Sequence, residues 1–168
     1  MDDTEEIRLV FDAVINDYPD DFEFLAKYAK FQFTFREKPT YDEDGQPIAA
    51  TAMRLSNRER DLYGADFEIC CHKETWDYYN EDMKERLIFH ELLHCQVAHD
   101  EEDEEIPAYD NDGRVYIYCV PHDIITKTFK REIEEFGLVG SDLDVASFMH
   151  KQYELHTSKK TAKKRRKR

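Results

Sequence analysis

The amino-acid sequence predicts one α+β domain, in which a small, mostly antiparallel sheet packs on a long helix with further helices at its flanks. Apolar residues alternate with polar ones over residues 31–35, as in a strand, and recur at helical spacing in several other segments. With 168 residues, 40% of them hydrophobic, the chain can bury one sizeable core but is short for two. We therefore expect one domain over residues 1–156 and a disordered basic tail over 157–168.

The first half of the chain is predicted to contain two helices followed by strands. Thr4 is a candidate cap for a first helix, which Pro19 ends. A second, shorter helix is expected over residues 21–30. The strands are expected at residues 31–35, 50–55 and 67–71, with turn chemistry at 39–47.

The second half is predicted to contain a long helix, a hairpin and a further helix. Asn80 is a candidate cap for a helix that continues to about Val97. Six consecutive acids, Asp100 to Glu105, then predict a solvated loop, because like charges at this density resist packing. The remaining expected elements are a hairpin turn at 110–113, a β-rich run at 115–120, a helix from Pro121 to Gly137 and another over 141–155.

Charge is divided unevenly along the chain. The segment Lys159–Arg168 carries eight of the 24 basic side chains, so residues 1–158 hold 16 basic and 38 acidic groups, a net charge of −22. Such a body repels nucleic acids and anionic membranes, whereas the tail attracts them. The tail is therefore a possible nucleic-acid contact.

The chain shows no segment for a membrane or for secretion. No apolar run approaches the roughly 18 residues that span a bilayer, and the acidic segment Met1 to Glu6 is unlike a signal peptide. The four cysteines, Cys70, Cys71, Cys95 and Cys119, show no spaced disulfide framework. We expect a cytoplasmic protein with reduced thiols and no membrane contact.

Three residues point to chemistry: His90, Glu91 and His94, in the pattern His-Glu-x-x-His. Residues four apart on a helix share a face, so both histidines can direct a ring nitrogen at one metal ion. Glu91 lies beside that face, where it can accept a proton from an attacking water as a general base. The pattern is that of zinc hydrolases, and two core histidines that happen to be four apart are the alternative.

A catalytic zinc ion commonly has three protein ligands and one open position, so a third ligand is expected. His122 is the leading candidate, because it would begin the apolar stripe of the helix predicted there. His99 does not fit the six-residue step of the longer zinc-protease motif, and Asp123 suits the support of a ligand better than ligation. Alternatively, Cys95 and Cys119 could form a closed structural zinc site together with His122.

The order of these motifs resembles the phage metallopeptidase family, small zincin-like proteins encoded by phages and prophages. The resemblance covers residues 25–137, and it implies a zincin-like α+β fold. It also implies zinc held by His90, His94 and His122. Glu91 would be the catalytic base. The matching motifs are Phe31-Gln32-Phe33-Thr34-Phe35, Asp66-Phe67-Glu68-Ile69, Trp76, Arg86 to His94 and Pro121-His122-Asp123.

The resemblance suggests where a substrate could lie, although the acidic loop, the hairpin and the tail depart from the usual family pattern. In zincins the strand before the metal helix commonly binds an extended peptide, and here that strand contains Phe67, Glu68 and Ile69. An ordinary core strand is the alternative. Candidates for stabilising an oxyanion are Tyr116, Tyr118 and His72.

The leading hypothesis is a zinc-dependent metallopeptidase that cleaves a peptide or protein substrate, encoded by a phage or prophage and located in the host cytoplasm. Two alternatives come from other classes. One is a non-catalytic, zinc-containing binding module that targets a host factor. The other is a protein that associates with nucleic acid through Lys159–Arg168.

Overall fold

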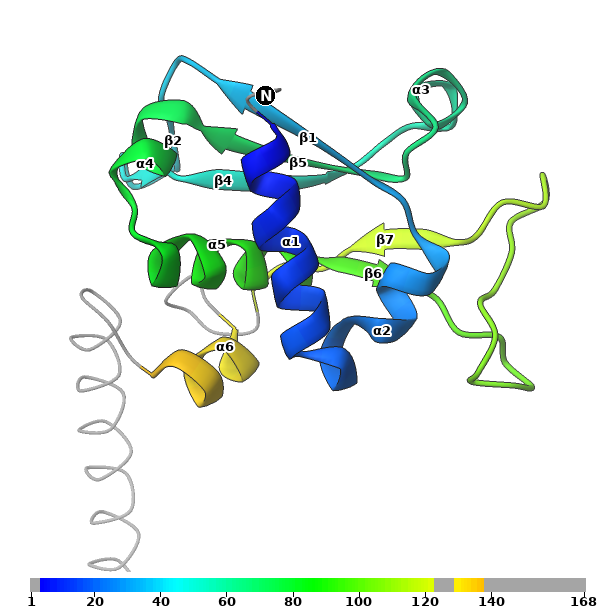
Figure 1. Ribbon diagram of the computed structural model, residues 1–168. Helices are drawn as coiled ribbons and strands as arrows, with labels where there is room; N and C mark the ends of the chain where they lie inside the picture. Colours follow the sequence, from blue (N-terminus) through cyan, green and yellow to red (C-terminus); the bar gives the residue numbers. More distant parts are fainter. Residues whose placement is uncertain (1–3, 123–128, 138–168) are drawn as a thin grey trace, which may run out of the picture. The chain divides into compact units, whose positions relative to one another are not determined.

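The computed structural model of the chain describes residues 4–122 and 129–137 (Figure 1). The chain divides into two compact units, Met1–His122 and Asp123–Arg168. Within the described residues the fold is α+β, with six helices and three small sheets, which confirms the predicted class. None of the helices in these two ranges is long and apolar enough to cross a membrane.

Two helices, α1 (Glu5–Asp17) and α2 (Pro19–Tyr28), open the first unit as predicted. The capping role predicted for Thr4 is wrong, because its side chain makes no capping hydrogen bond to α1. Pro19 occupies the first position of α2, where a missing N–H costs nothing. It therefore begins the second helix, two residues earlier than expected.

The three predicted strands are β1 (Phe31–Arg36), β4 (Ala50–Arg54) and β5 (Phe67–His72), and they form one sheet. The strand order is β1-β5-β4, with β5 parallel to β1 and antiparallel to β4. The sheet is therefore mixed, and the expectation of a mostly antiparallel sheet is wrong. The reason is topological: the chain forms the edge strand β4 before it returns as β5 to the middle.

The turn predicted over residues 39–47 is confirmed, and it lies in a small hairpin. β2 (Thr40–Tyr41) pairs antiparallel with β3 (Pro47–Ile48). The Asp42 carboxylate accepts hydrogen bonds from the backbone N–H groups of Asp44 and Gln46 at 2.9 and 2.8 Å. These bonds close the turn locally, which is why its sequence predicts it.

Two short helices, α3 (Asn57–Tyr63) and α4 (Lys73–Tyr78), were not expected from the sequence. α3 buries none of its residues, so it has no apolar stripe to recognise. It is held by a capping box between Ser56 and Glu59, and it ends at Gly64, whose φ of 67° is left-handed.

The long helix α5 (Glu81–His94) is capped by Asn80, whose side chain accepts a hydrogen bond from the Met83 N–H at 2.9 Å. The helix ends three residues before the predicted Val97, because residues 95–97 form a strand, β6 (Cys95–Val97). This strand pairs antiparallel with β7 (Ile117–Cys119). We call the pair the β6–β7 ribbon.

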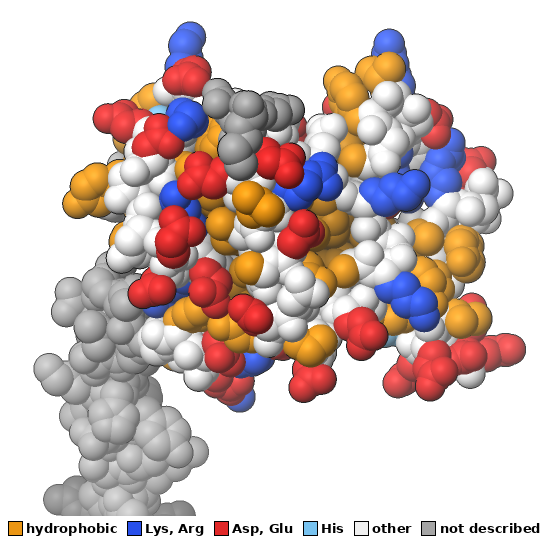
Figure 2. Space-filling model, in the orientation of Figure 1, with side chains coloured by type: hydrophobic (Ala, Val, Ile, Leu, Met, Phe, Trp, Pro, Cys, Tyr) orange, Lys and Arg blue, Asp and Glu red, His pale blue; other side chains and the backbone are white. Residues whose placement is uncertain are grey.

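The residues between the two strands of the ribbon form turns and loops. The predicted turn at 110–113 is confirmed by a backbone hydrogen bond from the Asp110 N–H to the Arg114 carbonyl at 2.8 Å and by a φ of 73° at Gly113. Residues 101–105 of the acidic run are exposed, as expected of a solvated loop. Acidic side chains are in fact spread across the visible face of the molecule (Figure 2).

The core of the first unit is apolar and centres on α5, which packs against α1 and β4. The Phe89 ring lies 4.9 Å from the Tyr18 ring and 5.1 Å from the Phe22 ring, in edge-to-face contacts that join α5 to the first two helices. The largest fully buried side chains include Trp76, Phe22, Phe67, Phe89, Ile7, Ile69, Ile88 and Leu92.

The described part of the second unit is α6 (Lys130–Phe136), which ends at Gly137 as predicted. The single helix expected from Pro121 to Gly137 is wrong, because Phe129 has an extended backbone with φ −112° and ψ 143°. Residues 123–128 and 138–168 lie outside the described ranges. Asp123, the helix predicted over 141–155 and the basic tail therefore lie outside the described residues.

Candidate metal centre

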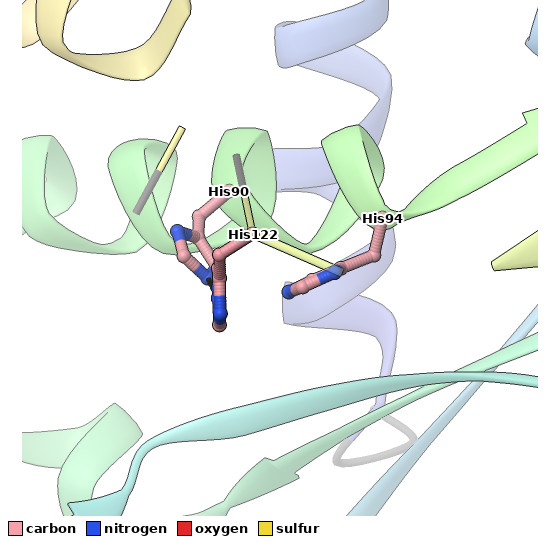
Figure 3. A group of neighbouring side chains, drawn as sticks. All are labelled: His90, His94 and His122. Carbon is pink, nitrogen blue, oxygen red and sulfur yellow. Dashed lines mark hydrogen bonds between the residues drawn. The ribbon is translucent and has the colours of Figure 1, made fainter. Parts of the chain in front are cut away.

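Three histidines, His90, His94 and His122, come together at one face of α5 (Figure 3). One ring nitrogen from each lies within 4.8 Å of those of the other two, and all three side chains are half-buried. His90 and His94 project from successive turns of α5, while His122 follows β7 in an irregular segment. Among the described residues this is the one group of histidine, cysteine and carboxylate side chains arranged to hold a metal ion.

A backbone carbonyl fixes the orientation of the His94 ring. Its Nδ1 lies 2.7 Å from the carbonyl oxygen of Val120. Because a carbonyl can only accept, Nδ1 must carry the proton, and the lone pair of a neutral ring is then on Nε2. The Val120 N–H also donates to the His94 carbonyl at 2.9 Å. The end of α5 and the end of the ribbon are thus tied by two hydrogen bonds.

The other two rings direct their Nε2 atoms at the same point. The Nε2 atoms of His90 and His122 are 3.0 Å apart. Two nitrogens bound to one tetrahedral zinc ion at about 2.0–2.1 Å would be about 3.3 Å apart, so a small outward movement would admit the ion. The donor set consists of imidazoles without a carboxylate, and this chemistry fits zinc or another late transition metal and not magnesium or calcium.

Glu91 follows His90 on α5 and is buried, with 4% of its surface exposed. Its carboxylate is outside the three-histidine group. Electrostatic repulsion from Glu91 contributes to raising the pKa of the thiols of Cys71 and Cys95, after the larger effect of burial. Glu91 is therefore a buried carboxylate whose charge acts on both thiols.

Cysteines do not join the cluster. Cys95 and Cys119 face each other across the ribbon, but neither belongs to the group that includes His122. Burial raises the pKa of the Cys95 thiol well above its usual value, and it also raises that of Cys119. The described residues therefore do not assemble the closed structural site that the sequence left open.

Other residues singled out in the sequence lie elsewhere. His99 is exposed, its Nδ1 donates to the Glu104 carbonyl at 2.7 Å, and its ring stacks on Phe24 at 4.1 Å. His72 is buried at the end of β5, where its Nδ1 is 2.8 Å from the Thr75 hydroxyl. Neither histidine belongs to the cluster.

Tyr118 lies in β7 and Tyr116 directly precedes this strand, with their ring centroids 6.4 Å apart. They are 50% and 39% exposed, so both phenols remain available to a bound molecule. Their role as oxyanion helpers stays a prediction.

The place suggested for a substrate strand is wrong. Phe67, Glu68 and Ile69 lie in β5, the central strand of its sheet, and each pairs with a residue of β1 on one side and of β4 on the other. A peptide that adds to a sheet needs a free edge, which β5 lacks. Phe67 and Ile69 are fully buried, so the alternative of a core strand holds.

The fold and the cluster define a class: a small α+β protein with three histidines that can hold a metal ion. The particular family follows from its sequence. The chain belongs to the family described as "Putative phage metallopeptidase", whose family model matches residues 1–153. This confirms the resemblance that the motif order indicated. No curated protein and no solved structure matches the chain.

Proposed function

We propose that this chain is a zinc-dependent, zincin-like metallopeptidase that hydrolyses peptide bonds, encoded by a phage or prophage and active in the host cytoplasm. The observation that carries the proposal is the three-histidine cluster with Glu91 next to His90 on the same helix. Membership of the family of phage metallopeptidases supports it.

We infer that zinc is held by the Nε2 atoms of His90, His94 and His122. Three protein ligands leave one position open, and the rings are half-buried, so solvent can reach that position. A zinc ion bound there would polarise a carbonyl group and lower the pKa of a water molecule. The Val120 carbonyl would hold the His94 ring in the tautomer that ligation requires.

Glu91 is proposed as the general base. It would accept a proton from the attacking water at its carboxylate and pass that proton to the leaving amine. Burial keeps bulk water away from the carboxylate, so the proton would move between Glu91 and the reacting groups.

An extended substrate would pair with β4 in place of β5. β4 is an edge of the sheet and the strand that packs against α5. The Ala49 carbonyl and the Leu55 N–H form hydrogen bonds directed toward β5. Backbone groups of successive residues in a strand point to opposite sides, so the N–H and carbonyl of Ala52 face the outer edge of the sheet. Ala52 is half-buried, which leaves it accessible to a peptide.

Replacing the base tests the proposal most directly. Glu91→Gln should retain one zinc per chain by elemental analysis and lose hydrolysis of labelled casein or of a quenched peptide library by about 10²- to 10⁴-fold. Glu81→Gln, on the exposed first turn of the same helix, is the matched control and should change neither quantity.

Two outcomes would overturn the mechanism. Undiminished hydrolysis by a zinc-loaded Glu91→Gln protein would exclude Glu91 as the base. Loss of zinc from this variant would instead assign Glu91 a role in holding the metal, and a non-catalytic zinc module that targets a host factor would then be favoured.

The basic tail is proposed as a nucleic-acid contact that coexists with the peptidase activity. Removing residues 159–168 should abolish binding to duplex DNA at low salt, because eight positive charges are lost. Melting temperature and zinc content should stay unchanged. DNA binding by the truncated chain that keeps the same dependence on salt would contradict this partner.

A further inference from the structure

Two cysteines face each other next to the candidate metal centre. In the β6–β7 ribbon Cys95 is the direct partner of Cys119. Cys95 follows His94 immediately, and Cys119 precedes His122 by three residues. The pair therefore joins the two chain segments that bring the histidines together.

The hydrogen-bond pattern of the ribbon determines the spacing of this pair. The Val120 N–H donates to the His94 carbonyl, and the Ala98 N–H donates to the Tyr116 carbonyl, both at 2.9 Å. Hydrogen-bonded and non-hydrogen-bonded pairs alternate along an antiparallel ladder, so Cys95 and Cys119 form a non-hydrogen-bonded pair. The Cα atoms of such pairs are about 4.5 Å apart, which lies within the range of about 4.4–6.8 Å found in disulfides.

Exposure distinguishes the two thiols. Cys95 is 1% exposed, whereas Cys119 is exposed. An external disulfide can therefore reach Cys119 first, and Cys95 is then positioned to react with it from the opposite strand. The other two cysteines, Cys70 and Cys71, are neighbours within β5, and their side chains point to opposite faces of the sheet.

We propose that Cys95 and Cys119 are a disulfide-forming pair that oxidised glutathione converts to a cross-strand bond. The Cys119 thiolate attacks one sulfur of glutathione disulfide and releases one glutathione. The Cys95 thiolate then attacks the Cys119 sulfur of the mixed disulfide and releases the second. Each thiol gives up one proton, two electrons pass to glutathione, and the protein gains one sulfur–sulfur bond.

The disulfide would cross-link the two strands of the ribbon without displacing the histidines. The strands are already in register, so the link forms between residues that are paired in the reduced protein. It would close the loop that contains the acidic run and the hairpin turn, which restricts the unfolded chain. A dithiol reductant would reverse the reaction by the same thiol–disulfide exchange.

The test uses the full chain, reduced and then incubated with oxidised glutathione at pH 8.5. After alkylation and tryptic digestion, mass spectrometry should find fragment 87–114 linked to fragment 115–127, because cleavage follows Arg86, Arg114 and Lys127. The melting temperature should rise by on the order of 5 °C or more and should fall back after dithiothreitol. Zinc binding should persist in the oxidised protein.

Matched variants make the outcome decisive. Cys119→Ser should lose the linked fragments and the rise in melting temperature, and Cys70→Ser should keep both. Glutathione adducts on wild-type Cys119 that never resolve to the linked fragments would overturn the proposal. Release of zinc on oxidation would contradict the expectation that the bond leaves the three histidines in place. Neither result depends on peptidase activity, so the test is separate from that of Glu91.

Discussion

The helix α5 and the β6–β7 ribbon supply the three histidines in different ways. His90 and His94 are placed by one turn of a single helix, and their spacing follows from helix geometry alone. His122 comes 28 positions after His94 and is placed by strand pairing, which ends in the two hydrogen bonds between His94 and Val120. A ligand pair within one element is local, whereas the third ligand position depends on the fold.

The two regions also differ in how much of them is buried. α5 contributes Ile88, Phe89 and Leu92 to the core, and all three are fully buried. In the ribbon Ile117 is buried, whereas Tyr118 and the preceding Tyr116 are exposed. We therefore expect α5 to determine the stability of the first unit, and the ribbon to determine the geometry of the metal centre.

The largest expected effect is on stability and tests the role of α5. Phe89→Ala should lower the free energy of unfolding by about 3–5 kcal/mol, because it removes a ring that contacts Tyr18 and Phe22 and leaves a cavity. Urea denaturation would measure the loss. Leu9→Ala is the control: Leu9 is 53% exposed on α1, and its loss should cost less than about 0.5 kcal/mol. Similar losses in the two variants would contradict the assignment of the core.

The next effect concerns the metal and compares the two sources of histidine. His94→Ala and His122→Ala should each weaken zinc binding by at least about 100-fold, measured by competition with a chelator. The unit should stay folded, because both side chains are only half-buried. His99→Ala is the control and should bind zinc like the wild type. If His122→Ala bound zinc like the wild type and His99→Ala bound it more weakly, the third ligand would be His99 and not His122.

Much of the fold could be predicted because the signals are local. Alternating phenylalanines mark β1, the Asn80 cap marks the start of α5, and the His-Glu-x-x-His spacing brings His90 and His94 to one face. Each of these patterns lies within one element. Its physical cause, side-chain alternation or helix periodicity, can therefore be recognised without tertiary contacts.

The features that the sequence does not predict depend on contacts between residues distant in sequence. The sequence predicts His122 at the start of a helical stripe, yet Phe129 is extended and His122 lies in the irregular segment after β7. Its position in the cluster results from the pairing of β6 with β7. Residues 95–97 continue the helical pattern of α5, so their sequence does not predict a strand. The Val120 carbonyl that orients His94 has no sequence signal, since every residue has a carbonyl. The sequence of β5 also does not show that β1 and β4 occupy both edges of this strand.

The smallest expected effect isolates the start of α5 from its metal-binding end. Asn80→Ala removes the side chain that accepts the Met83 N–H, and it should lower the free energy of unfolding by about 1 kcal/mol. Thr4→Ala is the matched control at the start of α1, where no side-chain cap exists, and it should cost only a few tenths of a kcal/mol. Urea denaturation of both variants measures the two losses of unfolding free energy, provided that the dependence on urea concentration (the m value) is the same for both.

Zinc affinity should be unchanged in the Asn80→Ala protein. His90 lies ten residues further along α5, about 15 Å from the cap, so fraying of the first turn does not reach it. The last turn is held separately, by the bonds from His94 to Val120. A fall in zinc affinity that accompanies the loss of the cap would show that α5 transmits disorder along its length. In that case the ribbon alone would not determine the geometry of the centre.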